Sequence, residues 1–335
     1  MNQSSSVRIR TKLVQSEDDQ LFLCPVCCNG SLVLDRTEND ENLKCRLCNA
    51  RVPVVNNIPR FVPHENYASS FGYQWNIHRR TQLDSYTGLS LSRDRIFGVS
   101  GWSECLASET ILEAGSGAGR FTEVLLSTGA RVVSFDYSEA VEANFSNNGK
   151  NPKLSLFQGD IFRIPLRKES FDKVMCLGVL QHTPDPGAAF AALTQYVKPG
   201  GMIIIDVYRN NLASLLHWKY FLRPITKRMN QQLLYRLIEK TVPHLVGTSA
   251  FLRRNFGRVG MRLLPILQYE HWGLTPELNR QWAILDTFDM YSPAHDHPQS
   301  LPTVRKWFEE AGLSEVDVRS GPNGVVARGV KPLKQ

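Results

Sequence analysis

The stretch TILEAGSGAGRFTEVLLSTGA, residues 110–130, decides the fold. It begins with a buried strand at Ile111 and Leu112 and continues as a glycine-rich turn and a helix with one apolar face. The turn holds Gly115, Gly117 and Gly119. Glycine lets a backbone approach a ligand closely, so this strand, turn and helix predict a nucleotide-type binding site.

The next strand helps to choose among the nucleotide ligands. The glycine pattern is GxGxG, and Arg120 stands where a dinucleotide fingerprint has its last glycine, so NAD is the weaker interpretation. The segment RVVSFD ends at Asp136, 19 residues after Gly117. A carboxylate at that strand end can accept hydrogen bonds from two ribose hydroxyls.

Strands and helices continue to alternate along the chain. LSLFQGD places Asp160 at the end of a third strand, FDKVMCL at 171–177 is a fourth, and MIIIDV at 202–207 is a fifth. A helix at 301–313 and two final strands, SEVDVRS and GVVARGVK, follow. The pattern predicts an α/β fold with a parallel sheet covered by helices on both faces.

Four cysteines near the amino terminus form two pairs. They are Cys24-x2-Cys27 and Cys45-x2-Cys48, with 17 residues between the pairs. Two such turns can supply the four thiolates of a structural zinc site, and SLVL and NLKC predict the short strands of a zinc ribbon. A redox CxxC pair is the alternative, and Cys28 is interpreted as a spectator.

Together, residues 110–208 resemble the class I S-adenosylmethionine-dependent methyltransferases, in the order and spacing of their segments. The resemblance implies a Rossmann-like sheet of seven strands and S-adenosylmethionine as cofactor. It also implies that cofactor-binding residues are Glu113, Gly115, Gly117, Gly119, Asp136, Asp160, Ile161, Leu177 and Gly178. Within that set, the first four would line the methionine end, Asp136 the ribose, Asp160 and Ile161 the adenine, and Leu177 and Gly178 the sulfonium.

The chain then divides into parts with different expected tasks. We expect a zinc ribbon at 20–63, a helical cover segment at 64–107, a methyltransferase domain at 108–209 and 300–332, and a largely helical insert or lid at 210–299. The ribbon and the segments around it resemble a bacterial group often associated with polysaccharide and other biosynthetic gene clusters. That resemblance implies a small-molecule, sugar or lipid-linked glycan acceptor.

The positive charge of the chain is concentrated in one segment. Eleven basic residues and one acid lie between Val207 and Arg262, whereas the net charge of the whole chain is +7. Aromatic residues are interleaved with these cations, a mixture that suits an anionic acceptor, an anionic membrane surface or RNA. A solvated basic face with buried aromatic rings is the alternative. In the cover segment, Arg79 and Arg80 are further candidates for holding an anion.

Two histidines are candidate catalytic residues for a hydroxyl acceptor, because a histidine suits proton removal near neutral pH. The first is His182, which the family pattern places beside the methyl group, and the second is His295. His295 lies in LDTFDMYSPAHDHP, residues 285–298, which is dense in polar side chains. These could supply a general base or a second metal site, or only hydrogen-bond their own loop; they are Asp286, Asp289, Tyr291, His295, Asp296 and His297.

The sequence therefore predicts a methyltransferase that acts on such an acceptor. One alternative is an enzyme that methylates RNA. A second alternative is a module that binds the cofactor without catalysis. The segment QHTPDP follows the fourth strand where many base-methylating enzymes carry a Pro-Pro-aromatic motif, which weighs against RNA. No apolar run approaches the roughly 20 residues of a membrane span, and MNQSSSVRIRTKLVQ lacks the apolar core of a secretory signal. These features favour the cytoplasm, with peripheral contact at the inner membrane surface through the basic insert.

Overall fold

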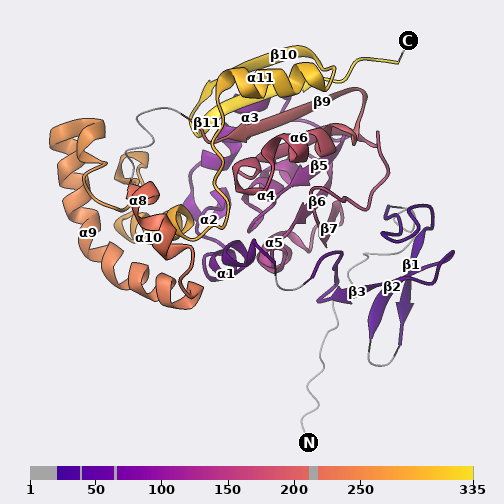
Figure 1. Cartoon of the computed structure of the whole chain (residues 1–335), viewed down its shortest axis with the longest axis horizontal. Coiled ribbons are helices and arrows are strands. Elements are labelled where there is room, and N and C mark those ends of the chain that lie inside the picture. The colour runs from indigo at the N-terminus through magenta and orange to yellow at the C-terminus, as the bar shows by residue number, and fades with distance from the viewer. Residues whose placement is uncertain (1–20, 38–39, 64–65, 211–217, 335) are drawn as a thin grey trace, which may run out of the picture.

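A computed structural model describes residues 21–37, 40–63, 66–210 and 218–334 of the 335-residue chain. The first 20 residues, where the sequence predicts no secretory signal, lie outside the described residues, as does the start of the basic aromatic segment of the insert. Figure 1 shows a central sheet with a small cysteine-bearing sheet on one side and the helical insert on the opposite side.

The central sheet has seven strands in the order β10-β11-β9-β8-β5-β6-β7. Their bounds are β5 (Thr110–Ala114), β6 (Arg131–Asp136), β7 (Leu154–Gln158), β8 (Phe171–Leu177), β9 (Val197–Val207), β10 (Ser314–Gly321) and β11 (Gly324–Val330). This confirms the predicted seven-stranded α/β fold. The predicted parallel pairing is confirmed for β5 to β9, the strands that alternate with helices, whereas β11 runs antiparallel to β9 and β10. A two-residue turn joins β10 to β11, and such a turn can connect only antiparallel strands.

Each face of the sheet has its own hydrophobic core. Successive side chains of a strand point to opposite faces, so Ile203 and Ile205 enter one core while Ile204 enters the other. Helices α6 (Pro186–Thr194) and α11 (Leu301–Glu310) cover the first face. The second face is covered by α3 (Leu91–Ser100), α4 (Arg120–Ser127) and α5 (Ala140–Asn148).

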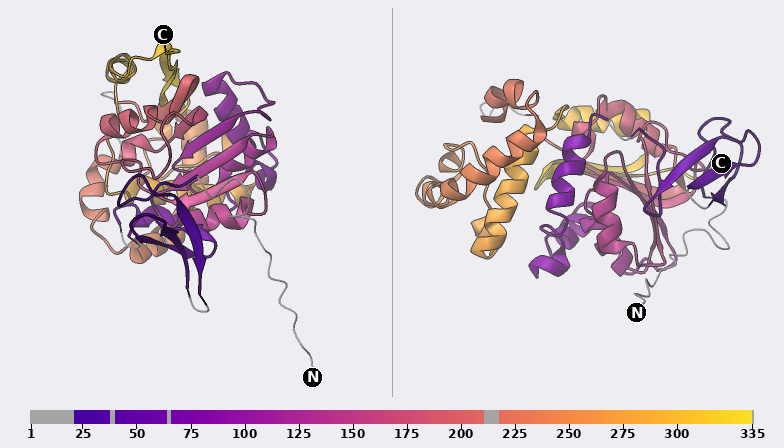
Figure 2. Two further views of the ribbon diagram at one scale, coloured as in Figure 1. Left: turned by 90° about the vertical axis from the view of Figure 1, so that its right-hand side faces the viewer. Right: turned by 90° about the horizontal axis from the view of Figure 1, so that it is seen from below.

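The cysteine-bearing sheet is antiparallel and packs at the β7 edge of the central sheet. Its strands are β1 (Leu32–Arg36), β2 (Glu41–Cys45), β3 (Arg51–Val55) and β4 (Ile58–Pro59), so the two predicted ribbon strands are present. Phe22 and Phe61 flank this sheet and contact the ring of Phe157 on β7, with ring centroids 5.3 and 5.8 Å away. Figure 2 shows the sheet projecting from the main body.

The remaining helices surround the carboxyl ends of the central strands. They are α1 (Ser69–Ile77), α2 (Asp84–Thr87), the short η2 (Leu180–His182), α8 (Trp218–Thr226), α9 (Gln231–Gly260), η3 (Glu270–Trp272) and α10 (Pro276–Tyr291). The insert is helical as expected and has a separate core in which Leu234 and Ile238 of α9 pack with Phe288 of α10. None of the described helices combines the length and apolar character needed to cross a bilayer.

Candidate functional site

One cavity of about 730 Å³ lies where the cover segment, the central sheet and the insert meet. Gly115, Asp136 and Gly178 line it, immediately after β5, at the end of β6 and after β8. Ligands of open α/β sheets bind at these carboxyl strand ends, where the connecting loops diverge. The volume suits a nucleotide together with a second small molecule.

The glycine-rich loop is shaped by contacts that exclude side chains. Gly115 has φ +76°, and a Cβ there would lie 2.2 Å from a methyl group of Val179. At Gly117, with φ +52°, a Cβ would lie 3.3 Å from the Trp75 ring. Side chains of the protein itself therefore favour glycine at both positions, and α1 supplies the indole beside the loop. The close approach of a ligand to this backbone stays a prediction.

Asp136 ties the glycine loop to the end of β6. One carboxylate oxygen accepts a hydrogen bond from the Gly117 amide at 2.9 Å, and the other accepts from the Ser138 amide and hydroxyl at 2.8 and 2.7 Å. Burial raises the pKa of Asp136, and these hydrogen bonds oppose that shift. The neighbouring Ser116 hydroxyl is buried in the cavity wall and has no hydrogen-bond partner among the described residues. An adenosyl ligand offers the polar atoms that such a wall needs.

The other predicted cofactor residues fall into two groups. Ile161, Leu177 and Gly178 line the cavity beside the glycine loop. Asp160 and Glu113 are not among the lining residues. Asp160 and Glu113 lie at different places behind the cavity wall. Asp160 accepts a hydrogen bond from the Phe162 amide at 2.9 Å and so shapes the loop after β7.

Glu113 lies beneath the glycine loop on β5. Its side chain is buried and accepts hydrogen bonds from the hydroxyls of Thr122 on α4 and Ser134 on β6. Burial raises the pKa of Glu113 to about 7. Glu113 therefore holds strand and helix together behind the loop, which differs from the predicted place at the methionine end of the cofactor.

His182 lies in the cavity wall with its ring between two aromatic side chains. Phe71 of α1 and Tyr208, directly after β9, have ring centroids 5.0 and 5.4 Å from it. The Nδ1 atom lies 3.1 Å from the backbone carbonyl of His295, which can only accept, so Nδ1 carries the proton and Nε2 of the neutral ring is free of one. Burial lowers the pKa of His182 below 6.5, against the opposing charges of Asp289 and Asp296.

His295 has a different place from that expected for a catalytic residue. Its ring packs near those of Tyr67 and His297 and is not among the cavity-lining groups. Its backbone carbonyl instead holds the His182 ring, which makes it a positioning group. The idea of a second metal site in 285–298 has no support, because the cysteines form the one candidate metal cluster found among the described residues.

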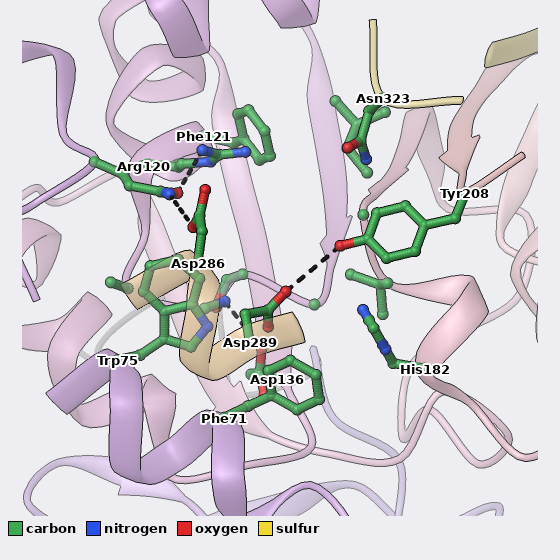
Figure 3. A pocket seen from close by; sticks show the side chains of 18 of the residues that line it. Phe71, Trp75, Arg120, Phe121, Asp136, His182, Tyr208, Asp286, Asp289 and Asn323 are labelled. Carbon is green, nitrogen blue, oxygen red and sulfur yellow. Dashed lines mark hydrogen bonds between the residues drawn. The ribbon is translucent and has the colours of Figure 1, made fainter. Parts of the chain in front are cut away.

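Two carboxylates on α10 belong to the segment 285–298, in which the sequence offers a general base or a second metal site. Asp286 accepts hydrogen bonds from Gln82 at 3.0 Å and from the Trp282 indole at 3.1 Å. Asp289, one turn later, accepts from Gln74 at 3.1 Å and from the Tyr208 hydroxyl at 3.4 Å. Figure 3 shows the Tyr208 hydroxyl pointing to Asp289, with the His182 ring beside Tyr208.

Asp286, unlike the buried Glu113, is a cavity-lining carboxyl group with a pKa raised toward neutral pH. Burial raises the pKa of Asp286 to about 7, and the charge of Asp289 acts in the same direction. Arg120 lines the cavity nearby and donates to the Gln82 side-chain oxygen, so its charge partly opposes the shift. The i, i+3 spacing of the two acids places them on one helix face, and that was the signal available in the sequence.

A buried ion pair supports the loop after β8. Asp206, near the end of β9, receives two hydrogen bonds from the Arg95 guanidinium at 2.8 and 2.6 Å and one from the Gly178 amide. The side chain of Asp206 is 1% exposed. This arrangement fixes Gly178 in the cavity wall from two elements, α3 and β9, that are distant in sequence.

The four predicted metal ligands come together at the end of the small sheet. Their sulfur atoms all lie within 4.8 Å of one another, with Cys24 and Cys48 3.5 Å apart and Cys27 and Cys45 3.7 Å apart. Amide groups of Leu47 and Cys48 donate to the Cys45 sulfur. Four converging sulfurs at these separations fit a tetrahedral ion with metal–sulfur bonds near 2.3 Å, as expected of zinc. Cys28 is exposed and outside the cluster, in agreement with its interpretation as a spectator.

The comparison with known proteins identifies the central domain. Residues 112–205 match the family model described as a methyltransferase domain. The chain carries an S-adenosylmethionine-dependent methyltransferase domain. This confirms the resemblance stated for the glycine loop and the strands that follow it.

Curated relatives match different shares of the chain. A ubiquinone biosynthesis O-methyltransferase of Thiobacillus denitrificans is 31% identical over 115 residues, 33% of this chain and 49% of that protein. An uncharacterized protein, syc1184_c, of Synechococcus is 25% identical over 252 residues, 72% of this chain and 53% of its own length. The chain spans about half the length of the curated relatives it matches. An O-methyltransferase family structure from Burkholderia thailandensis, 14% identical, covers 80% of this chain and 64% of that one with a TM-score of 0.44.

Proposed function

We propose that this protein transfers a methyl group from S-adenosylmethionine to a hydroxyl of a small-molecule, sugar or lipid-linked glycan acceptor. The observation that carries the proposal is the single cavity that contains both the glycine loop with Asp136 and the His182, Tyr208 and Asp289 cluster. The O-methyltransferase activity named for the Thiobacillus relative supports a hydroxyl as the accepting group. The sequence resemblance to enzymes of polysaccharide clusters supports the sugar class.

Residues of this chain would hold the cofactor, accept the proton of the acceptor and exclude water. S-adenosylmethionine, when bound, supplies a methyl group on a positively charged sulfonium. Asp136, Ile161 and the glycine loop would hold it at one end of the cavity. His182 would accept the hydroxyl proton at Nε2, since Nδ1 is bound to the His295 carbonyl. Phe71, Tyr208 and the insert would keep water from the reacting groups, and the main contribution to rate would be alignment.

The cavity also supports an anionic acceptor. Lys219 and Arg223 of α8 line it and share one carboxylate, with nitrogen atoms 2.9 Å from an Asp296 oxygen in each case. Cationic side chains in the cavity wall can donate charge-assisted hydrogen bonds to a carboxylate or phosphate on the ligand. Arg79 also lines the cavity, whereas Arg80 stacks on Tyr86 outside it.

The acceptor class is tested by transfer of labelled methyl into host-cell extract separated into small-molecule, lipid-linked glycan, RNA and protein fractions. Label is expected in one of the first two, and only when Asp136 is intact. Nuclease-sensitive label would replace this proposal with RNA methylation. Cofactor binding without label in any fraction, after addition of membrane extract, would favour the non-catalytic module.

We also propose that the cysteine cluster holds one structural zinc ion. Native protein should contain roughly one zinc per chain, and Cys45→Ser should lose it, because four thiolates close the coordination shell. Mass spectrometry of native protein gives the metal content, and limited proteolysis should show new cleavage within residues 21–63 of the variant. Cys105→Ser, an exposed cysteine outside the cluster, is the matched control and should keep the metal. Native protein without zinc, or a fully loaded Cys45→Ser variant, would contradict the assignment.

A further inference from the structure

Helix α8 exposes three of its apolar residues, whereas Leu222 packs on the core of the insert. Trp218, Phe221 and Ile225 lie at positions i, i+3 and i+7, so they share one face of the helix. Their exposed fractions are 39%, 63% and 67%. We name these three residues the outer stripe of α8.

The charged residues of the same helix point inward. The side chains of Lys219 and Arg223 are only 15% and 10% exposed, and both line the cavity with Asp296. A surface helix of a globular protein ordinarily buries its apolar face and solvates its cations. In α8 both cations lie inside, and the described residues leave Phe221 and Ile225 of the outer stripe mostly uncovered. Exposed apolar groups of this size in one place mark a surface that binds something else.

The surroundings of the outer stripe indicate the occupant. The Trp218 indole donates to the Arg262 carbonyl at 3.0 Å, and Leu263, the next residue along the chain, is exposed. Lys227 and Arg228 follow α8 directly and are exposed. Glu239 is the one acid between Val207 and Arg262 in the sequence. A tryptophan, large apolar side chains and an excess of cations match the headgroup region of an anionic bilayer.

We propose that the outer stripe of α8 docks this protein on an anionic phospholipid bilayer. Apolar side chains would enter the headgroup and acyl boundary, while the neighbouring cations would attract the negative surface. The cavity wall is the inner side of the same helix, so Lys219 and Arg223 would lie near the level of lipid phosphates. An acceptor anchored in the membrane could then reach the cavity without leaving the membrane.

Vesicle flotation of the full chain tests the proposal. Wild-type protein should float with vesicles of phosphatidylcholine and phosphatidylglycerol, bind weakly to phosphatidylcholine alone, and dissociate as salt rises. Phe221→Ser with Ile225→Ser should weaken partition about tenfold or more, because two exposed apolar side chains are removed from the interface. Val55→Ser with Leu333→Ser removes two exposed apolar side chains elsewhere and should bind as wild type does.

The membrane proposal and the proposed methyl transfer can be contradicted independently of each other. The affinity of the same variants for S-adenosylmethionine is measured by calorimetry and should stay unchanged. Equal flotation of wild type and the stripe variant would overturn the proposal, as would failure of wild type to bind anionic vesicles. Light scattering that shows wild-type dimers and stripe-variant monomers would also overturn it, since a second copy would then cover the stripe.

Discussion

Replacing His182 by glutamine is expected to lower kcat about a hundredfold to ten-thousandfold at saturating S-adenosylmethionine, the usual range for loss of a general base. Glutamine can still donate a hydrogen bond toward the His295 carbonyl but cannot take a proton from a hydroxyl near neutral pH. Cofactor affinity should change little, because Asp136 and the glycine loop are untouched. Single-turnover transfer to the acceptor identified by labelling, with calorimetry alongside, measures both.

The pH profile separates a base from a structural side chain. Burial lowers the pKa of His182 below 6.5, so the reactive neutral form should persist to lower pH and activity should fall only below that value. The free energy of unfolding should fall in the same direction. As the pH drops from 6.5 through the lowered pKa of His182, the unfolded chain binds the proton more readily than the folded chain does. His182→Gln should lose the acid limb of the profile. Wild-type turnover in this variant would remove His182 from the mechanism.

Asp286 is a second group that could produce an acid limb in the pH profile of activity, but at a different pH. Burial raises the pKa of Asp286 to about 7, so a profile governed by Asp286 would have its midpoint near 7 and would survive in His182→Gln. Asp286→Asn should then abolish the limb. If His182 is the base, Asp286→Asn should leave the position of the limb below 6.5.

The parts of this molecule that local patterns determine could be predicted from the sequence. The seven strands follow from short apolar runs, and the four metal ligands follow from two CxxC turns at suitable spacing. The glycine loop and Asp136 lie close together because β5 and β6 are neighbouring parallel strands that end at the same sheet edge. Each of these features depends on residues within one or two adjacent elements.

The parts that long-range packing determines could not be predicted in this way. Asp289 reaches the cavity only because α10 packs against α1, where Gln74 holds it across 215 positions of sequence. His295 was a candidate base by residue type, yet it contributes a backbone carbonyl, and no pattern distinguishes those two uses. Glu113 matches the family motif in sequence, but its side chain is buried under α4. The hydroxyls that donate to it belong to Thr122 and Ser134 of the protein itself.

Asp136→Ala is expected to weaken affinity for S-adenosylmethionine roughly tenfold to hundredfold, because hydrogen bonds to a charged group contribute about 1.5–3 kcal/mol. The loss has two sources. One is the predicted contact of the carboxylate with the ribose, and the other is its hydrogen bond to the Gly117 amide, which keeps the glycine loop in place. Isothermal calorimetry gives the affinity, and thermal unfolding shows whether the fold is retained.

A conservative variant separates the two sources. Asp136→Asn keeps one oxygen that can accept from the Gly117 amide, so the glycine loop should hold its shape, while the charge and the two hydrogen bonds from Ser138 are lost. Its affinity should therefore lie between those of wild type and Asp136→Ala. Asp160→Ala removes a carboxylate at the next strand end, behind the cavity wall, and should cost less than either. If Asp160→Ala weakens binding as much as Asp136→Ala does, the adenine contact implied by the family resemblance is present and the cofactor extends farther toward β7 than the cavity wall indicates.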